Sequence, residues 1–252
     1  RNELRDRNQD NQTLSNQDTN RQRIRFRYGV EGKVADDVKV NFRIATGSTT
    51  DPISTNQSFD TNFLKKTIVL DLANVEYTPQ ITGLSQLKVI GGIMESPLWS
   101  ISPLVFDGDL SFDGAAVKVS QETGPLMLFT NNGLFSLDTD EGESSALWVA
   151  QGGASLKPFA DAQEEVLKNF KVTAALAYHD YMNTYSSGTN KSGTDPLTRE
   201  GQNTAAVRDF NQLNPTFEIS SMMSEIPFSM YGDWVRNLAA NSDLDDGFQI
   251  GV

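Results

Sequence analysis

Polar and apolar residues alternate along two neighbouring segments near the start of the chain. Within residues 21–34, apolar side chains occupy even positions: Ile24, Phe26, Tyr28, Val30 and Val34. The odd positions of the same segment hold four arginines and other charged residues. A period of two places these two sets on opposite faces of a β-strand. The alternation resumes over residues 38–44 after a short acidic turn, which predicts a hairpin.

Further segments of the chain combine apolar runs with turn residues at their ends, as strands do. They are Lys65–Thr78, Ser85–Met94, Asp113–Gln121, Gly124–Leu137, Ser145–Lys157, Lys168–Asp180, Asn211–Ser224, Glu225–Asn237 and Gly247–Val252. The first of them is ambiguous, because Leu70 and Leu72 share one face whereas Val75 falls on the other. No helix of ordinary length is predicted, and residues 161–170 are expected to form one or two helical turns.

The connections between these segments differ systematically in length. Shorter links, such as residues 35–37 and 122–124, alternate with longer ones, such as residues 47–64, 95–112 and 181–210. Outer-membrane barrels have this asymmetry, because their turns are short on one side and their loops long on the other. The sequence therefore predicts an all-β fold, a transmembrane antiparallel up-and-down β-barrel of about 16 strands. About 11 of them lie in this chain.

This parity also predicts how the chain is organised. Residues 1–252 are expected to form a single outer-membrane β-barrel domain that is incomplete at both ends, with residues 1–20 as an external loop. No stretch reaches the about 18–20 apolar residues that a spanning helix needs. The chain has no cysteine, which excludes thiol catalysis, thiolate metal sites and disulfides.

Charge is distributed unevenly along the chain. The formal net charge is −12, which argues against binding to nucleic acid. Residues 1–43 nevertheless contain 10 of the 21 basic residues and only 7 of the 33 acidic ones. Arginines are therefore concentrated near the start of the chain, and carboxylates later.

Several stretches resemble a known family. They read RIRFRYGVEGKVADDVKVNFRIATG, KKTIVLDLANVEYTP, LKVIGGIMESPLW and FDGDLSFDG. These stretches resemble the putative porin family of Gram-negative outer membranes, and the order of elements is similar to that of the phosphate-selective porins, which are 16-stranded trimers. The resemblance implies an outer-membrane channel, a homotrimer, and a third external loop at residues 95–112 that folds inward and narrows the pore. That loop contains Glu95 and no Lys or Arg, unlike the basic loop expected of a phosphate pathway.

The alternation also predicts which side chains line the pore. If the apolar set faces lipid, the basic residues that face the lumen are Arg21, Arg23, Arg25, Arg27, Lys39 and Arg43. The acidic residues expected to face them from the constriction loop are Asp107, Asp109 and Asp113. Opposite charges across a lumen would create a transverse field that orders small polar solutes. In the alternative interpretation, the arginines pair with neighbouring carboxylates such as Glu31 and Asp71, and the loop aspartates form turns.

The leading functional hypothesis is a porin of the cell outer membrane whose water-filled channel passes ions and small polar solutes by passive diffusion. Its expected partners are outer-membrane lipid, lipopolysaccharide and small hydrophilic solutes. The alternative is a structural, adhesive or assembly-sleeve barrel whose lumen is plugged. A soluble all-β binding module is a third hypothesis, but the continuous apolar face of residues 24–30 would aggregate in water.

No residue pattern predicts an enzyme, a cofactor or a metal. His179 is the only histidine, and no G-x-S-x-G nucleophile motif is present. Residues 107–114 and 138–143 contain spaced carboxylates but not the twelve-residue calcium pattern with its terminal Glu. Phosphate-binding and dinucleotide-binding motifs are also absent.

Overall fold

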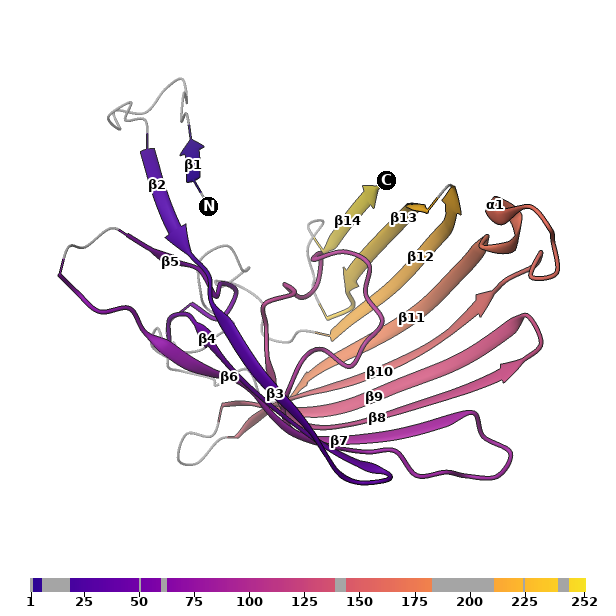
Figure 1. Cartoon of the computed structure of the whole chain (residues 1–252), viewed down its shortest axis with the longest axis horizontal. Helices are drawn as coiled ribbons and strands as arrows, with labels where there is room; N and C mark the ends of the chain where they lie inside the picture. Colours follow the sequence, from indigo (N-terminus) through magenta and orange to yellow (C-terminus); the bar gives the residue numbers. More distant parts are fainter. Residues whose placement is uncertain are drawn as a thin grey trace.

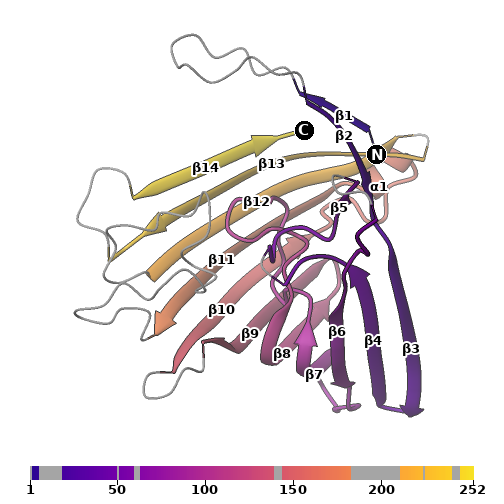
Figure 2. The same ribbon diagram turned by 90° about the vertical axis from the view of Figure 1, so that its left-hand side faces the viewer.

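Antiparallel β-strands make up most of the computed structural model of this chain (Figure 1). It describes residues 2–5, 19–49, 51–59, 63–138, 144–182, 211–223, 225–239 and 245–252. Eleven strands form one sheet in the order β14-β13-β12-β11-β10-β9-β8-β7-β6-β4-β3, and a small separate sheet has the order β1-β2-β5. The large sheet is strongly curved but not closed, with β3 and β14 at its two edges (Figure 2).

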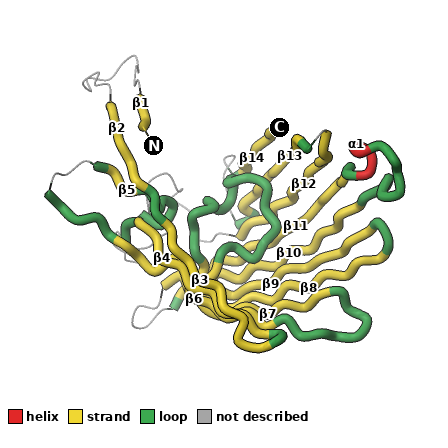
Figure 3. Tube along the Cα trace, in the orientation of Figure 1, coloured by secondary structure: helices red, strands yellow, loops and turns green. Residues whose placement is uncertain are grey.

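The strands have the following bounds: β1 Asn2–Arg5, β2 Thr19–Ile24, β3 Arg27–Ala35, β4 Val38–Thr46, β5 Gln57–Ser58, β6 Ile68–Tyr77, β7 Gln86–Met94, β8 Phe112–Thr123, β9 Leu126–Asp138, β10 Ser145–Leu156, β11 Lys171–Met182, β12 Asn211–Met223, β13 Ile226–Asn237 and β14 Asp246–Gly251. Each strand of the large sheet pairs antiparallel with the next strand of that sheet along the chain. The predicted set of eleven strands and their up-and-down order are therefore confirmed. The helical turn expected within residues 161–170 is α1, Glu165–Lys168 (Figure 3).

No helix among the described residues is long and apolar enough to cross a membrane.

One predicted strand is divided in the structure. Residues 21–34 do not form one strand, because β2 ends at Ile24 and β3 begins at Arg27. The division occurs where the chain changes its pairing partner: β3 pairs with β4, whereas β2 pairs with β5 through Arg23 and Ile24. Residues 1–20, expected as a loop, include β1, which pairs with residues 19–22 of β2.

A β-bulge in β6 explains why its alternation is ambiguous in the sequence. Arg43 of β4 pairs with Leu72, but the next residue, Ile44, pairs with Leu70. Asp71 is therefore an extra residue, as in a β-bulge, and its side chain is only 4% exposed. The alternation changes phase at this point, so that residues 68 and 70 are exposed before the bulge and residues 75 and 77 after it.

The two faces of the large sheet have opposite character. On the outer, convex face, large apolar side chains are exposed, among them Val30, Phe42, Leu70, Val75, Leu128, Leu134, Leu176, Phe217, Met230 and Ile250. On the inner, concave face, polar side chains are buried, among them Asp71, Asn74, Asn131, Gln151, Thr173, Asn214, Thr216, Glu218 and Asp233. A water-soluble protein has the reverse arrangement.

The main apolar cluster also lies on the inner face. Its buried members are Ile90, Met94, Phe112, Ala116, Phe135, Leu147, Val149 and Tyr181. Leu98, Phe106 and Leu110 pack against it from the loop of residues 95–111, which connects β7 to β8. The cluster therefore forms an apolar seat for this loop, and the loop lies on the concave side of the sheet (Figure 1).

Candidate functional site

The candidate site consists of the polar inner face and the loop of residues 95–111, which we call the inward loop. This loop leaves β7 after Met94, passes over strands distant in the sequence, and enters β8 at Phe112. Several sets of hydrogen bonds and ion pairs, described below, attach it to the wall. Because these contacts add to the apolar seat, the position of the loop is determined by side chains from at least five strands.

The first attachment joins the loop backbone to an amide side chain of β10. The N–H of Trp99 donates to Oε1 of Gln151, and Nε2 of Gln151 donates to the carbonyl of Trp99, both at 2.8 Å. Asn131 donates to the same Oε1 at 2.8 Å, which fixes the orientation of the buried glutamine. Gly153, two residues along, leaves room for the ring of Phe129, whose edge packs against Trp99.

The second attachment reaches β13, near the far edge of the sheet. The hydroxyl of Ser102 donates to Oδ2 of Asp233. The other oxygen of Asp233 accepts hydrogen bonds from Asn214 at 2.7 Å and from Thr216 at 3.0 Å. Asp233 is 5% exposed, so the loop hydroxyl completes the partners of a buried carboxylate.

The third attachment joins the end of the loop to two arginines. Oδ1 of Asp109 accepts hydrogen bonds from Arg25 at 2.5 Å and from Arg27 at 2.8 Å. Its other oxygen accepts from the backbone and the hydroxyl of Thr55. Burial by itself would raise the pKa of Asp109, but the Thr55 N–H and the two guanidinium charges together hold that pKa below its usual value.

The remaining arginine of this cluster is neutralised in the same way. Arg43 donates to Asp71 at 2.5 Å and to Glu95 at 2.6 Å. Asp71 also lies 3.7 Å from Arg27, so the bulge in β6 places one carboxylate between two arginines. We call this group the arginine cluster; it comprises Arg25, Arg27, Arg43, Asp71, Glu95 and Asp109. Its three cations are matched by three carboxylates.

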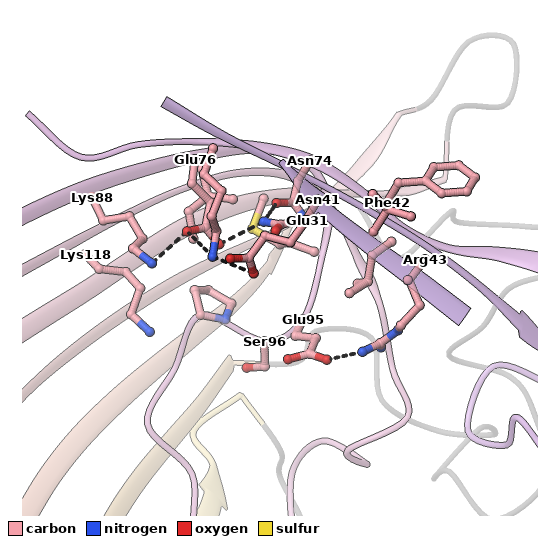
Figure 4. A pocket seen from close by; sticks show the side chains of 17 residues that line it. Glu31, Asn41, Phe42, Arg43, Asn74, Glu76, Lys88, Glu95, Ser96 and Lys118 are labelled. Carbon is pink, nitrogen blue, oxygen red and sulfur yellow. Dashed lines mark hydrogen bonds and ion pairs between the residues drawn. The ribbon is translucent and has the colours of Figure 1, made fainter. Parts of the chain in front are cut away.

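A second charged group, the lysine cluster, lies on the same wall beside the start of the inward loop. It comprises Lys39 together with Lys88, Lys118, Glu31 and Glu76, which are labelled in Figure 4. Lys39 lies 2.9 Å from Glu31 and 3.8 Å from Glu76, and Lys88 donates to Glu76 at 2.8 Å. Together with the start of the inward loop, these residues line a pocket of about 460 Å³.

The predicted site residues are distributed over three settings. Arg25, Arg27, Lys39 and Arg43 all form ion pairs on the inner side of the wall. Arg23 lies in β2 within the small sheet, and the side chain of Arg21, in the same strand, is outside the described part of the structure.

The three predicted aspartates separate in the structure. Only Asp109 contacts the arginines. Asp107 forms a turn instead, because its carboxylate accepts the N–H of Asp109 at 2.8 Å. Asp113 is not in the loop and does not face these arginines: it pairs with Ile93 as the second residue of β8 and points to the face opposite Phe112. Because β8 begins at Phe112 with an inward side chain, the next side chain, that of Asp113, points outward. The expectation that Asp113 belongs to the constriction loop and faces the arginines is therefore wrong.

A comparison with known protein families identifies the family of this chain. The family model described as a putative porin matches residues 2–233. The chain belongs to this family. A search of curated proteins finds no match. Membership in a porin family agrees with a sheet whose polar face is turned inward and whose apolar face is exposed.

Sequence reasoning missed several residues of this porin-family site. Gln151, Asp233 and Lys118 occupy inward positions of their strands, so alternation combined with polarity could have indicated them. Asp71 could not be found in this way, because its inward position depends on the bulge. The apolar seat was also missed, because it is formed by residues from several strands and from the inward loop, which are far apart in the sequence.

His179 lies beside this seat, against the inward loop. Its ring is fully buried and packs edge-on against Phe106 of the inward loop, with 5.3 Å between ring centres. In the described ranges, no group of three potential metal ligands comes together. Residues 139–143, part of one acidic run, lie outside those ranges.

Proposed function

We propose that this chain forms the wall of an outer-membrane porin whose water-filled lumen passes ions and small polar solutes by passive diffusion. The observation that carries the proposal is the inversion of the two faces of the sheet. Apolar side chains such as Leu134 and Leu176 are exposed on the outside, whereas Asn131 and Thr173 are buried inside. Lipid around the outer face explains the exposed apolar side chains, and water in the lumen explains the polar inner face.

A lipid environment also imposes a closed barrel. Backbone N–H and C=O groups at the free edges of β3 and β14 have no partners in a hydrocarbon phase, and a barrel has no edges. We therefore place the eleven strands within a closed barrel of about 16 strands, the size that the resemblance implies. The surrounding outer-membrane lipid and lipopolysaccharide, and a homotrimeric assembly, belong to this proposal.

The inward loop is the proposed constriction. It is attached at Gln151, at Asp233 and at Arg25 with Arg27, so it stays on the lumen side of the wall. A channel selects by its width and by the groups that line it. The loop contributes backbone, apolar side chains and two carboxylates, Glu95 and Asp109, that are already paired with arginines, which favours a general diffusion pore of low charge selectivity.

The same loop supports a second candidate function, a barrel whose lumen is plugged and which serves as a structural, adhesive or assembly sleeve. Its apolar seat, with Phe106 packed between Phe112 and His179, occupies space on the concave side. The two candidates differ in one measurable property, the passage of solute.

Liposome swelling tests the proposal directly. The folded full-length protein, reconstituted into liposomes, is expected to let arabinose, glucose and a disaccharide enter at rates that fall with solute size. Liposomes that contain the heat-denatured protein are the control. A folded protein that admits none of the three sugars would contradict the diffusion pore and support the plugged barrel.

A further inference from the structure

The lysine cluster contains one more cation than its carboxylates neutralise. Glu31 and Glu76 account for Lys39 and Lys88, at N···O distances of 2.9 and 2.8 Å. Lys118, which lines the same pocket, forms no ion pair with any residue that the structure describes. The adjacent arginine cluster is fully matched, so the unneutralised charge of these two clusters lies at Lys118.

The pairing of the strands places no carboxylate directly opposite Lys118. Lys118 of β8 stands directly opposite Lys88 of β7, and like charges in such a pair destabilise a sheet. On the other side, Lys118 faces Asn131 of β9, whose amide is already donated to Gln151. Neither flanking strand therefore supplies a counter-charge, and an anion in the pocket would relieve the repulsion.

We infer that this pocket binds the carboxylate of a small organic monoanion, with Lys118 as its principal anchor. The inference rests on the proposed function, because the solute reaches the pocket from the lumen. A single surplus positive charge selects a single negative charge: a monoanion leaves the lysine cluster neutral, whereas a dianion would give it a net negative charge beside Glu76.

The rest of the pocket indicates the body of the ligand. Its floor contains Leu72, Ile90, Met94 and Pro97, which are apolar and partly or fully buried. The nearby amides of Asn41 and Asn74 are already donated, to Asn74 and to the carbonyl of Ile93. A volume of about 460 Å³ admits a ring or a short chain. The ligand class is thus a monocarboxylate with a compact apolar body.

Three probes that share a benzene ring but differ in charge test this inference. Benzoate, benzamide and phthalate carry charges of about −1, 0 and −2 at pH 7.5, and each is titrated by calorimetry into the folded full-length protein in detergent. In parallel, each is added to planar bilayers to measure block of the KCl current. Benzoate is expected to bind and to block saturably, and the other two at least about tenfold more weakly.

The variant K118Q removes the proposed anchor without leaving a carboxylate unpaired, so folding is expected to be unaffected. K171Q is the matched control, because Lys171 lies on the inner side of β11, where it lines a different pocket. Benzoate affinity should fall at least about tenfold in K118Q, be retained in K118R and be unchanged in K171Q.

The outcomes test the proposed binding site and the proposed channel separately. Equal affinity in wild type and K118Q, or equal loss in K118Q and K171Q, overturns the site even when the current is normal. Absence of wild-type current, with benzoate binding that depends on Lys118, overturns the channel and leaves the site in place. Phthalate that binds more tightly than benzoate overturns the choice of a monoanion.

Discussion

Two aspartates of the inward loop differ in their partners, and this difference is expected to determine how much each contributes to holding the loop. Arg25 and Arg27 share the carboxylate of Asp109, which also accepts two hydrogen bonds from Thr55. The side chain of Asp109 is 15% exposed, so its ion pairs are partly shielded from water. Asp107, two residues earlier, contacts the backbone of its own loop and no arginine by a described ion pair. These two aspartates therefore form a natural comparison.

The substitution D109N is expected to destabilise the folded protein by about 1–2 kcal/mol, because two guanidinium groups lose their shared charged acceptor. The end of the inward loop should then fluctuate, which appears as increased noise in the single-channel current. D107N removes the same formal charge but leaves both arginines paired, so its current should resemble that of the wild type. Equal noise in the two variants would show that the ion pairs do not hold the loop.

The pH dependence of this attachment follows from the lowered pKa of Asp109. Because the pKa is lower in the folded state, the stabilisation is complete above the usual aspartate value of about 4. It is lost as the pH falls through the lowered pKa. Wild-type and D107N channels should become noisy only at pH values below about 4, whereas D109N should be noisy at neutral pH. Recordings between pH 3 and pH 7 measure this.

Among the elements, the inward loop connects parts of the sheet that are far apart in the sequence. It joins β7 and β8 by the chain, β10 through Gln151, β13 through Asp233 and β3 through Arg27. The apolar seat adds hydrophobic contacts from Leu98, Phe106 and Leu110. A loop with this many attachments is expected to move with the wall rather than independently of it.

Q151A is expected to loosen the inward loop at Trp99 and to cost roughly 2 kcal/mol, because the partly buried N–H and carbonyl of Trp99 lose their partners. Limited chymotrypsin digestion of the detergent-folded protein should then cut the loop faster than in the wild type. Q80A is the control, since Gln80 is exposed in the link between β6 and β7. Unchanged digestion of Q151A would mean that the apolar seat alone holds the loop.

At this scale, alternation and turn residues were sufficient to predict the eleven strands and their order. They could not predict the break between β2 and β3, because it depends on β5, a partner more than thirty residues later in the chain. The bulge at Asp71 was visible only as an ambiguity. Alternation places Phe135 and Leu147 inward, but nothing local indicates that a loop covers them.

For the whole molecule, the decisive feature is that the large sheet carries apolar side chains on its outer face and polar side chains on its inner face. Exposed apolar side chains on the outer face require a non-aqueous surrounding, and buried polar side chains on the inner face require either water or partners. The structure supplies partners for many of the latter through the inward loop, as at Gln151 and Asp233. The central claim is therefore that this loop narrows the lumen and leaves it open.

Planar-bilayer conductance of the refolded full-length protein tests this claim most directly. The comparison variant has residues 98–109 replaced by a short Gly-Ser linker, which removes the constriction and keeps β7 and β8 joined. We expect stable ohmic steps for the wild type and larger steps for the variant. A folded wild type without conductance, beside a conducting variant, would show that the loop plugs the barrel and that the lumen is not open.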